Sequence, residues 1–75
     1  MNQQLDARRL LCPMPVIRTQ DAIAKLNNGD VIDVVCTDPG ALIDVPTWCR
    51  INGHKVLKIS EKNNEIIITI EVAGH

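Results

Sequence analysis

Aromatic residues are almost absent from this chain of 75 residues, which has no tyrosine, no phenylalanine and a single tryptophan. A hydrophobic core must therefore be built from aliphatic side chains, mainly isoleucine and valine. A chain of this length buries only about 60% of the surface that its unfolded form exposes. We expect one small domain, spanning residues 1–75, with marginal stability.

Excess charge of either sign and long apolar runs are also missing. The net charge is -1, which provides no general attraction to nucleic acid or to an anionic membrane. No apolar segment approaches the roughly 20 residues of a membrane-spanning helix. No beginning typical of a signal peptide is visible either. We therefore expect no direct nucleic-acid partner and no membrane association.

The chain also lacks the paired cysteines of a disulfide framework. It has three cysteines, an odd number, and none of them forms a C-x-x-C pair. Small secreted proteins with disulfide frameworks usually have an even count. Structural zinc sites usually have closely spaced ligand pairs. The cysteines therefore predict free thiols in the reducing cytoplasm, and we expect no metal site.

The pattern that remains predicts six short elements. They are a strand or extended entry at 3–7, a helix at 15–28, a strand at 30–37, a second helix at 38–53, and strands at 55–60 and 65–72, the last two joined by a polar loop at 61–64. Two helices cannot cover both faces of a four-stranded sheet. The order therefore favours a two-layer α+β sandwich with both helices on one side of the sheet.

The helix boundaries rest on local signals. Asn28-Gly29 is typical of a helix end, and Asp38-Pro39 is typical of a helix start. Pro46 lies inside the second predicted helix. Either that helix kinks at Pro46, or an initial turn leads into a helix that begins near Asp44, and we favour the first alternative.

A reactive thiol is predicted at Cys12, which opens the sequence Cys-Pro-Met-Pro at the start of the first predicted helix. The first amides of a helix have no intrahelical acceptor, and the helix dipole places partial positive charge there. A gain of about 1 kcal/mol for the anion would lower the thiol pKa by roughly one unit from about 8.5. Arg8 and Arg9 add positive charge, so we expect a useful fraction of thiolate at neutral pH.

The two prolines near Cys12 predict a stiff, protruding loop. Pro13 biases Cys12 towards an extended backbone, and Pro15 fits the first helical turn, where its missing N–H costs nothing. Met14 between them would offer a soft apolar contact to a partner. The alternative is that Cys12 is a small buried hydrophobe, as free cysteines often are. Its position at a helix start favours the exposed thiol.

Two segments resemble the TusA/SirA-like family of small sulfur carriers. LDARRLLCPMP, at 5–15, resembles the family signature of Leu-Asp, a short stretch with glycine, and Cys-Pro-x-Pro. TDPGALIDVPTWC, at 37–49, is similar to the family's Asp-Pro and Asp-Ile-Pro-x-aromatic-Cys segment. The resemblance implies a β-α-β-α-β-β sandwich with a four-stranded mixed sheet, like the C-terminal domain of translation initiation factor three.

The resemblance also implies a sulfurtransferase that acts as a relay. Cys12 would accept sulfur as a persulfide from a cysteine desulfurase or a rhodanese-like donor and pass it to an acceptor protein. The acceptor pathway could be tRNA thiolation, molybdenum cofactor synthesis or sulfur oxidation. Such a relay needs no cofactor. Two alternatives remain: a regulatory or binding module in which Cys12 is only redox-sensitive, and nucleic-acid binding, which rests on fold analogy alone.

Four residues besides Cys12 have expected roles or consequences. The family commonly has glycine at the position of Arg9, which implies a turn with positive φ or a close approach of the backbone. An arginine would be strained if that backbone were kept; the alternatives are that the loop differs, or that the extra charge tunes the thiol or selects a partner. We expect Cys36 to be a packing residue. We expect Cys49 to be structural as well, with a secondary role as a resolving or redox thiol as the alternative. His54 is expected to be solvated in a turn.

Overall fold

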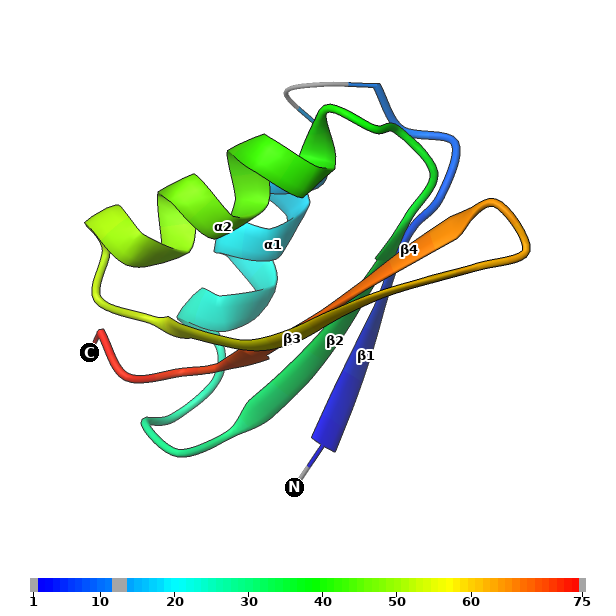
Figure 1. The fold of residues 1–75 in the computed structure, drawn as a ribbon. Helices are drawn as coiled ribbons and strands as arrows, with labels where there is room; N and C mark the ends of the chain where they lie inside the picture. The colour runs from blue at the N-terminus through cyan, green and yellow to red at the C-terminus, as the bar shows by residue number, and fades with distance from the viewer. Residues whose placement is uncertain (1, 12–13, 75) are drawn as a thin grey trace.

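The computed structural model describes residues 2–11 and 14–74, which form a four-stranded sheet covered on one face by two helices (Figure 1). The elements are β1 (Asn2–Ala7), α1 (Met14–Ala24), β2 (Val31–Cys36), α2 (Ala41–Ile51), β3 (Lys55–Lys62) and β4 (Glu65–Glu71). The predicted order and the two-layer α+β sandwich are confirmed. Neither helix is long and apolar enough to cross a membrane within the described ranges.

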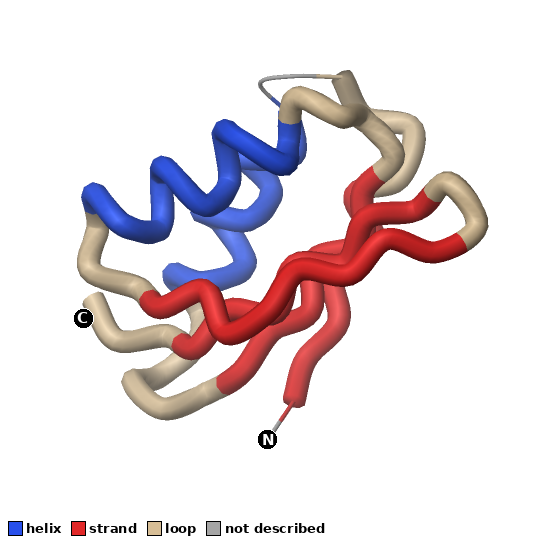
Figure 2. The backbone as a smooth tube through the Cα atoms, viewed as in Figure 1, coloured by secondary structure: helices blue, strands red, loops and turns tan. Residues whose placement is uncertain are grey.

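The sheet is mixed, with the strand order β1-β2-β4-β3. Figure 2 shows the strands as one layer and the helices as the other. β1 pairs in parallel with β2, while β4 pairs antiparallel with both β2 and β3. A parallel neighbour requires a crossover, and α1 provides it. As a result, β1 and β2 end on the same side of the sheet, and the chain leaves both ends close to the start of a helix (Figure 1).

The core lies between the sheet and the helices and is aliphatic, as the composition predicts. Alternate residues of β2 and β4 point towards the helices, and α1 and α2 contribute one buried stripe each. The buried side chains include Ile32, Val34 and Cys36 from β2, Ile66, Ile68 and Ile70 from β4, Ile23 from α1 and Val45 from α2. On the opposite face, the hydroxyl of Thr69 donates a hydrogen bond of 2.8 Å to Asp33.

The first helix ends at Ala24, four residues before the predicted end. The next two amides, of Lys25 and Leu26, bond to carbonyls three residues back, which tightens the chain out of the α-helix. The positive φ expected after Asn28 is present, since Gly29 has φ 94°. Gly29 nevertheless does not cap the helix, because its amide bonds to the carbonyl of Val72 at 2.7 Å and ties the loop to the end of β4.

The second helix begins at Ala41 rather than at the predicted Asp38. Asp38 accepts a hydrogen bond of 3.0 Å from the amide of Gly40, so its carboxylate closes a turn before the helix. Pro46 lies inside a single helix, so the alternative of a helix that begins near Asp44 is wrong, while the kink at Pro46 stays a prediction. The predicted stop is confirmed, with Asn52 as the C-cap and Gly53 at φ 84°.

The polar loop predicted at 61–64 is a two-residue turn instead. β3 continues to Lys62, which pairs with Glu65, so only Asn63 and Asn64 remain between the strands. Both asparagines have positive φ, 53° and 63°, as a type I′ hairpin turn requires. The prediction was wrong because Asn-Asn is a weaker hairpin signal than Asn-Gly, while asparagine still tolerates the left-handed region.

His54 is buried, and the prediction that it is solvated is wrong. Only 8% of its surface is exposed. Its Nδ1 accepts hydrogen bonds from the amides of Ala73 and Gly74, at 3.2 and 3.1 Å. Its ring stacks on Trp48 with centroids 5.3 Å apart. The imidazole thus joins the end of α2 to the segment after β4, which is a structural role.

Candidate functional site

The predicted sulfur-accepting residue, Cys12, and its neighbour Pro13 lie outside the described residues. The residues on either side are described. The amide of Met14 donates a hydrogen bond of 2.8 Å to the carbonyl of Leu11, and Met14 is the first residue of α1. The side chain of Leu11 is 75% exposed. The described residues that flank Cys12 and Pro13 are therefore an exposed leucine and the first residue of α1.

Downstream of Cys12, Pro15 belongs to the core. Pro15 is fully buried in the first turn of α1, where the sequence predicts it. Its carbonyl accepts a hydrogen bond of 2.7 Å from the hydroxyl of Thr19, which is also fully buried. Met14, predicted as an apolar contact for a partner, is half-buried. Pro15 thus fixes the start of α1 by packing as well as by its restricted φ.

This packing predicts different effects for the two prolines. Pro15→Ala removes about two buried methylene groups, at ~0.8 kcal/mol each, together with an unfolded-state term below ~1 kcal/mol. We expect a loss of about 2 kcal/mol and a melting temperature lower by roughly 10 °C. Pro13→Ala should lose only the unfolded-state term and melt within a few degrees of the wild type. Equal melting temperatures for the two variants, measured by calorimetry, would contradict the role of Pro15 in the core.

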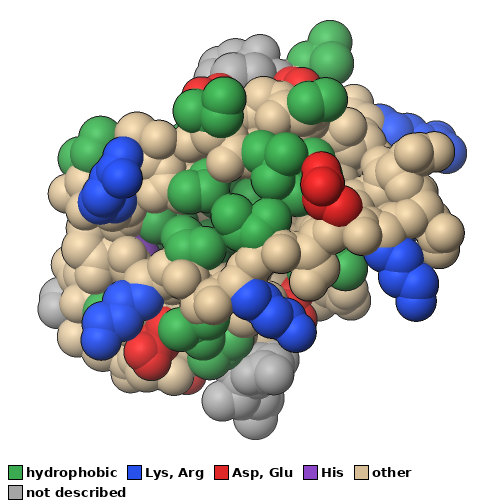
Figure 3. Space-filling view, in the orientation of Figure 1, with side chains coloured by type: hydrophobic (Ala, Val, Ile, Leu, Met, Phe, Trp, Pro, Cys, Tyr) green, Lys and Arg blue, Asp and Glu red, His purple; other side chains and the backbone are tan. Residues whose placement is uncertain are grey.

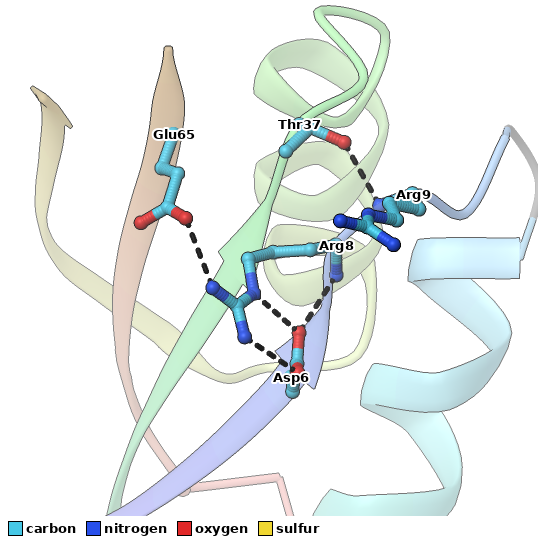
Figure 4. Close-up of polar contacts among 5 residues, drawn as sticks. All are labelled: Asp6, Arg8, Arg9, Thr37 and Glu65. Carbon is cyan, nitrogen blue, oxygen red and sulfur yellow. Dashed lines mark hydrogen bonds and ion pairs between the residues drawn. The ribbon is translucent and has the colours of Figure 1, made fainter. Parts of the chain in front are cut away.

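Upstream of Cys12, Arg9 adopts a backbone conformation that suits glycine. Its φ is 66°, in the region that costs an L-residue roughly 1–2 kcal/mol. The positive φ inferred from the usual glycine at this position is therefore present, with arginine occupying it. The amide of Arg9 donates a hydrogen bond of 2.9 Å to the hydroxyl oxygen of Thr37, the residue that follows β2 (Figure 4).

Arg8 is held by two carboxylates (Figure 4). Its guanidinium pairs with Asp6 at 2.9 Å and with Glu65 at 3.1 Å. The Asp6 carboxylate also accepts a bond of 3.1 Å from the amide of Arg8. These hydrogen bonds lower the pKa of Asp6 to about 2, and the bond from the Arg8 side chain has the largest effect. The two carboxylates in turn hold the pKa of Arg8 above its usual value.

Of the two arginines that were expected to favour a thiolate at Cys12, Arg8 has its charge paired in the structure. The charge of Arg8 is compensated by Asp6 and Glu65, so we expect it to favour a thiolate at Cys12 less than the sequence indicates. Arg8 and Arg9 line an open concavity of about 490 Å³ together with Asn63 and Asn64 of the β3–β4 turn. Arg8 serves mainly to connect the end of β1 with the start of β4.

The Asp6–Arg8 pair predicts a pH dependence. The folded-state pKa of Asp6, about 2, lies below the ordinary aspartate value of 3.8. The pair therefore contributes its full stability above pH 3.8 and loses it as the pH falls through about 2. In Asp6→Asn the melting temperature should fall less between pH 4 and pH 2 than in the wild type. The difference should be small because both side chains are exposed. Parallel pH curves for the two proteins would contradict this assignment.

The two described cysteines are core residues. Cys36 and Cys49 are free and fully buried. Burial raises the pKa of Cys49 to about 11. Burial, and then the charge of Asp38, raises the pKa of Cys36. Both thiols are therefore protonated at neutral pH. Among residues 2–11 and 14–74, no three His, Cys, Asp or Glu side chains lie close enough together to hold a metal ion.

Thr37 and Glu65 are the site residues that the sequence did not indicate. Thr37 lies 28 positions from Arg9, and Glu65 lies 57 positions from Arg8. A threonine after a strand and a glutamate at a strand start are common surface residues. The strand pairing brings them to the site: the parallel pair of β1 and β2 places the residues just beyond Ala7 and Cys36 side by side, and the pairing of Cys36 with Ile66 places Glu65 next to them.

The described residues form a two-layer α+β sandwich, and the sequence between β1 and α1 carries the Cys-Pro-Met-Pro stretch. The model of the sulfurtransferase TusA family matches residues 3–72, and the chain belongs to this family. A candidate sulfur carrier protein of Neisseria meningitidis is 36% identical over 70 residues, covering 93% of this chain and 95% of that protein. The sulfur carrier protein TusA of Buchnera aphidicola is 34% identical over 62 residues, covering 83% and 78%.

A solved structure shows the same fold. The crystal structure of a SirA-like protein from Desulfitobacterium hafniense superimposes with a TM-score of 0.84 at 29% identity. The match covers 97% of this chain and 99% of that one. The architecture predicted from the resemblance is therefore confirmed by an independent comparison of structures.

Proposed function

We propose that this protein is a sulfur carrier that accepts sulfur as a persulfide on Cys12 and delivers it to an acceptor protein. The observation that supports this most directly is the way both flanks of Cys12 are held. Thr37 fixes Arg9 on one side, and buried Pro15 fixes the start of α1 on the other. A thiol between two fixed flanks at a helix start suits an encounter between proteins, in which the sulfur atoms must meet in one geometry.

The proposed step is a thiol–persulfide exchange. The Cys12 thiolate attacks the terminal sulfur of a persulfide on the donor cysteine, forming one S–S bond as the donor's own S–S bond breaks. The electron pair of the broken bond leaves on the donor cysteine as a thiolate, and the transferred sulfur keeps its proton. No net oxidation occurs, so the step needs neither a metal nor a redox cofactor. The partial positive charge at the start of α1 favours the thiolate.

The partners follow from this chemistry. We propose a cysteine desulfurase or a rhodanese-like protein as the donor, because each presents a persulfide on a cysteine. The acceptor is a further protein thiol, in tRNA thiolation, molybdenum cofactor synthesis or sulfur oxidation. The proposed location is the cytoplasm, where Cys12 would remain reduced. We propose that Arg9, Pro13 and Met14 shape the surface that meets these partners, while residues 1–75 act as a single domain.

Intact-mass spectrometry tests the proposal. The protein is incubated with a cysteine desulfurase and cysteine, and its mass is measured with and without a reductant. We expect a gain of one sulfur atom that the reductant removes. A protein that keeps its mass with a desulfurase, and also with a rhodanese-like donor, would contradict the carrier function. The result would then favour the alternative, a binding module with a redox-sensitive Cys12.

A further inference from the structure

The backbone of Arg9 is held in a conformation that arginine rarely adopts. Its φ of 66° lies in a region that glycine populates readily and that other L-residues avoid. Such a conformation persists only where the surrounding structure holds it, and strained residues of this kind gather at functional sites. Arg9 is three residues before Cys12 in the sequence. The group that holds Arg9 therefore bears on the proposed sulfur transfer.

The described contact that holds this backbone is made by Thr37. The parallel ladder of β1 and β2 ends at the pair Ala7 and Cys36. Arg9 and Thr37 lie just beyond this pair, where ladder hydrogen bonds are no longer available. The hydroxyl oxygen of Thr37 accepts the amide of Arg9 at 2.9 Å in their place (Figure 4). Thr37 is half-buried at the end of β2, so its position is fixed by the sheet.

We propose that Thr37 is a positioning residue for sulfur transfer. This proposal rests on the carrier function proposed above. By holding the Arg9 amide, it fixes the upstream flank of Cys12 as the buried Pro15 fixes the downstream flank. Without this bond, the segment before Cys12 would have more conformations, and a donor protein would have to order it at each encounter. A small sulfur donor makes no extended contact and would not depend on this order.

The test compares three variants with the wild type. Thr37→Val keeps the shape of the side chain and removes the acceptor oxygen, and Thr37→Ser keeps the oxygen. Thr69→Val is the matched control, since it removes a hydroxyl that bonds to Asp33 on the face of the sheet opposite the helices. Sulfur uptake is measured with a cysteine desulfurase as the donor and, separately, with inorganic polysulfide. Hydrogen exchange of the Arg9 amide is followed by NMR.

We expect Thr37→Val to raise the KM of the desulfurase for the carrier about five-fold, the effect of one typical hydrogen bond. Its kcat and its uptake from polysulfide should be nearly unchanged, and exchange at Arg9 should accelerate. Thr37→Ser and Thr69→Val should behave like the wild type in transfer. A Thr37→Val variant with wild-type KM, or a Thr37→Ser variant as impaired as Thr37→Val, overturns the proposal. If the wild type takes up no sulfur, the carrier function itself is contradicted. Unchanged exchange of the Arg9 amide in Thr37→Val would separately contradict the proposal that the hydrogen bond to Thr37 orders this segment.

Discussion

Cys12→Ser is expected to take up no sulfur from a desulfurase, whereas the wild type gains one sulfur atom. The reason is chemical, because a serine hydroxyl is not ionised at neutral pH and cannot attack a persulfide sulfur. The other two thiols cannot replace Cys12, since Cys36 and Cys49 are fully buried. The loss should therefore be complete. Intact-mass spectrometry after incubation with a desulfurase and isotopically labelled cysteine measures it.

The matched controls are Cys36→Ala and Cys49→Ala, each of which leaves Cys12 in place. Both should still gain one sulfur atom, although each should be somewhat less stable because a buried side chain is shortened. Equal labelling of Cys12→Ser and the wild type would refute the assignment of Cys12. Loss of labelling in a folded Cys49→Ala variant would instead support the alternative role of Cys49 as a second reactive thiol.

Alkylation of the native protein is expected to modify Cys12 far faster than the two core cysteines. A thiol with a pKa of about 11, as burial gives Cys49, is ionised at pH 7 in only about one molecule in ten thousand. Its complete burial also keeps reagents away until the core opens. Cys36 is equally buried, and its pKa is raised as well. We expect rates for both that are at least ~100-fold below that of Cys12.

The measurement follows alkylation with time by mass spectrometry, with and without denaturant. One label should appear rapidly on the native wild type and none on native Cys12→Ser, while unfolded wild type should take up a label on each of its three cysteines. Rapid alkylation of Cys49 in the folded protein would show that the core opens easily at α2. Slow alkylation of Cys12 would remove the support for a thiolate at this position.

The boundaries of elements were predictable only where a residue permits few conformations. Gly53 ends the second helix at the predicted place because its φ of 84° excludes most other residues. The end of the first helix was misplaced, because Gly29 bonds to Val72 and thereby serves β4 rather than the helix. The start of the second helix was also misplaced, because an acid before a proline can close a turn as well as begin a helix, and Asp38 closes a turn by accepting the amide of Gly40.

His54 illustrates a side chain whose surroundings the sequence does not reveal. A histidine in an Asn-Gly-His-Lys stretch is typical of an exposed turn. Burial results from residues distant in the sequence, since the amides of Ala73 and Gly74 bond to its ring. Its other neighbour, Trp48, is close in sequence but reaches the ring only because α2 ends just before β3.

The sequence by itself determined the aliphatic core, the order of the six elements and the two-layer arrangement, and it predicts a reactive thiol at Cys12. These features follow from local periodicity and from proline and glycine, whose effects act within a few residues. Only the tertiary structure decided which groups hold the segment around Cys12: Thr37 on Arg9, Asp6 and Glu65 on Arg8, and the core around Pro15. The physical reason is that hydrogen bonds and ion pairs form between groups that are close in space. The pairing of β1 with β2, and of β2 with β4, brought these groups together.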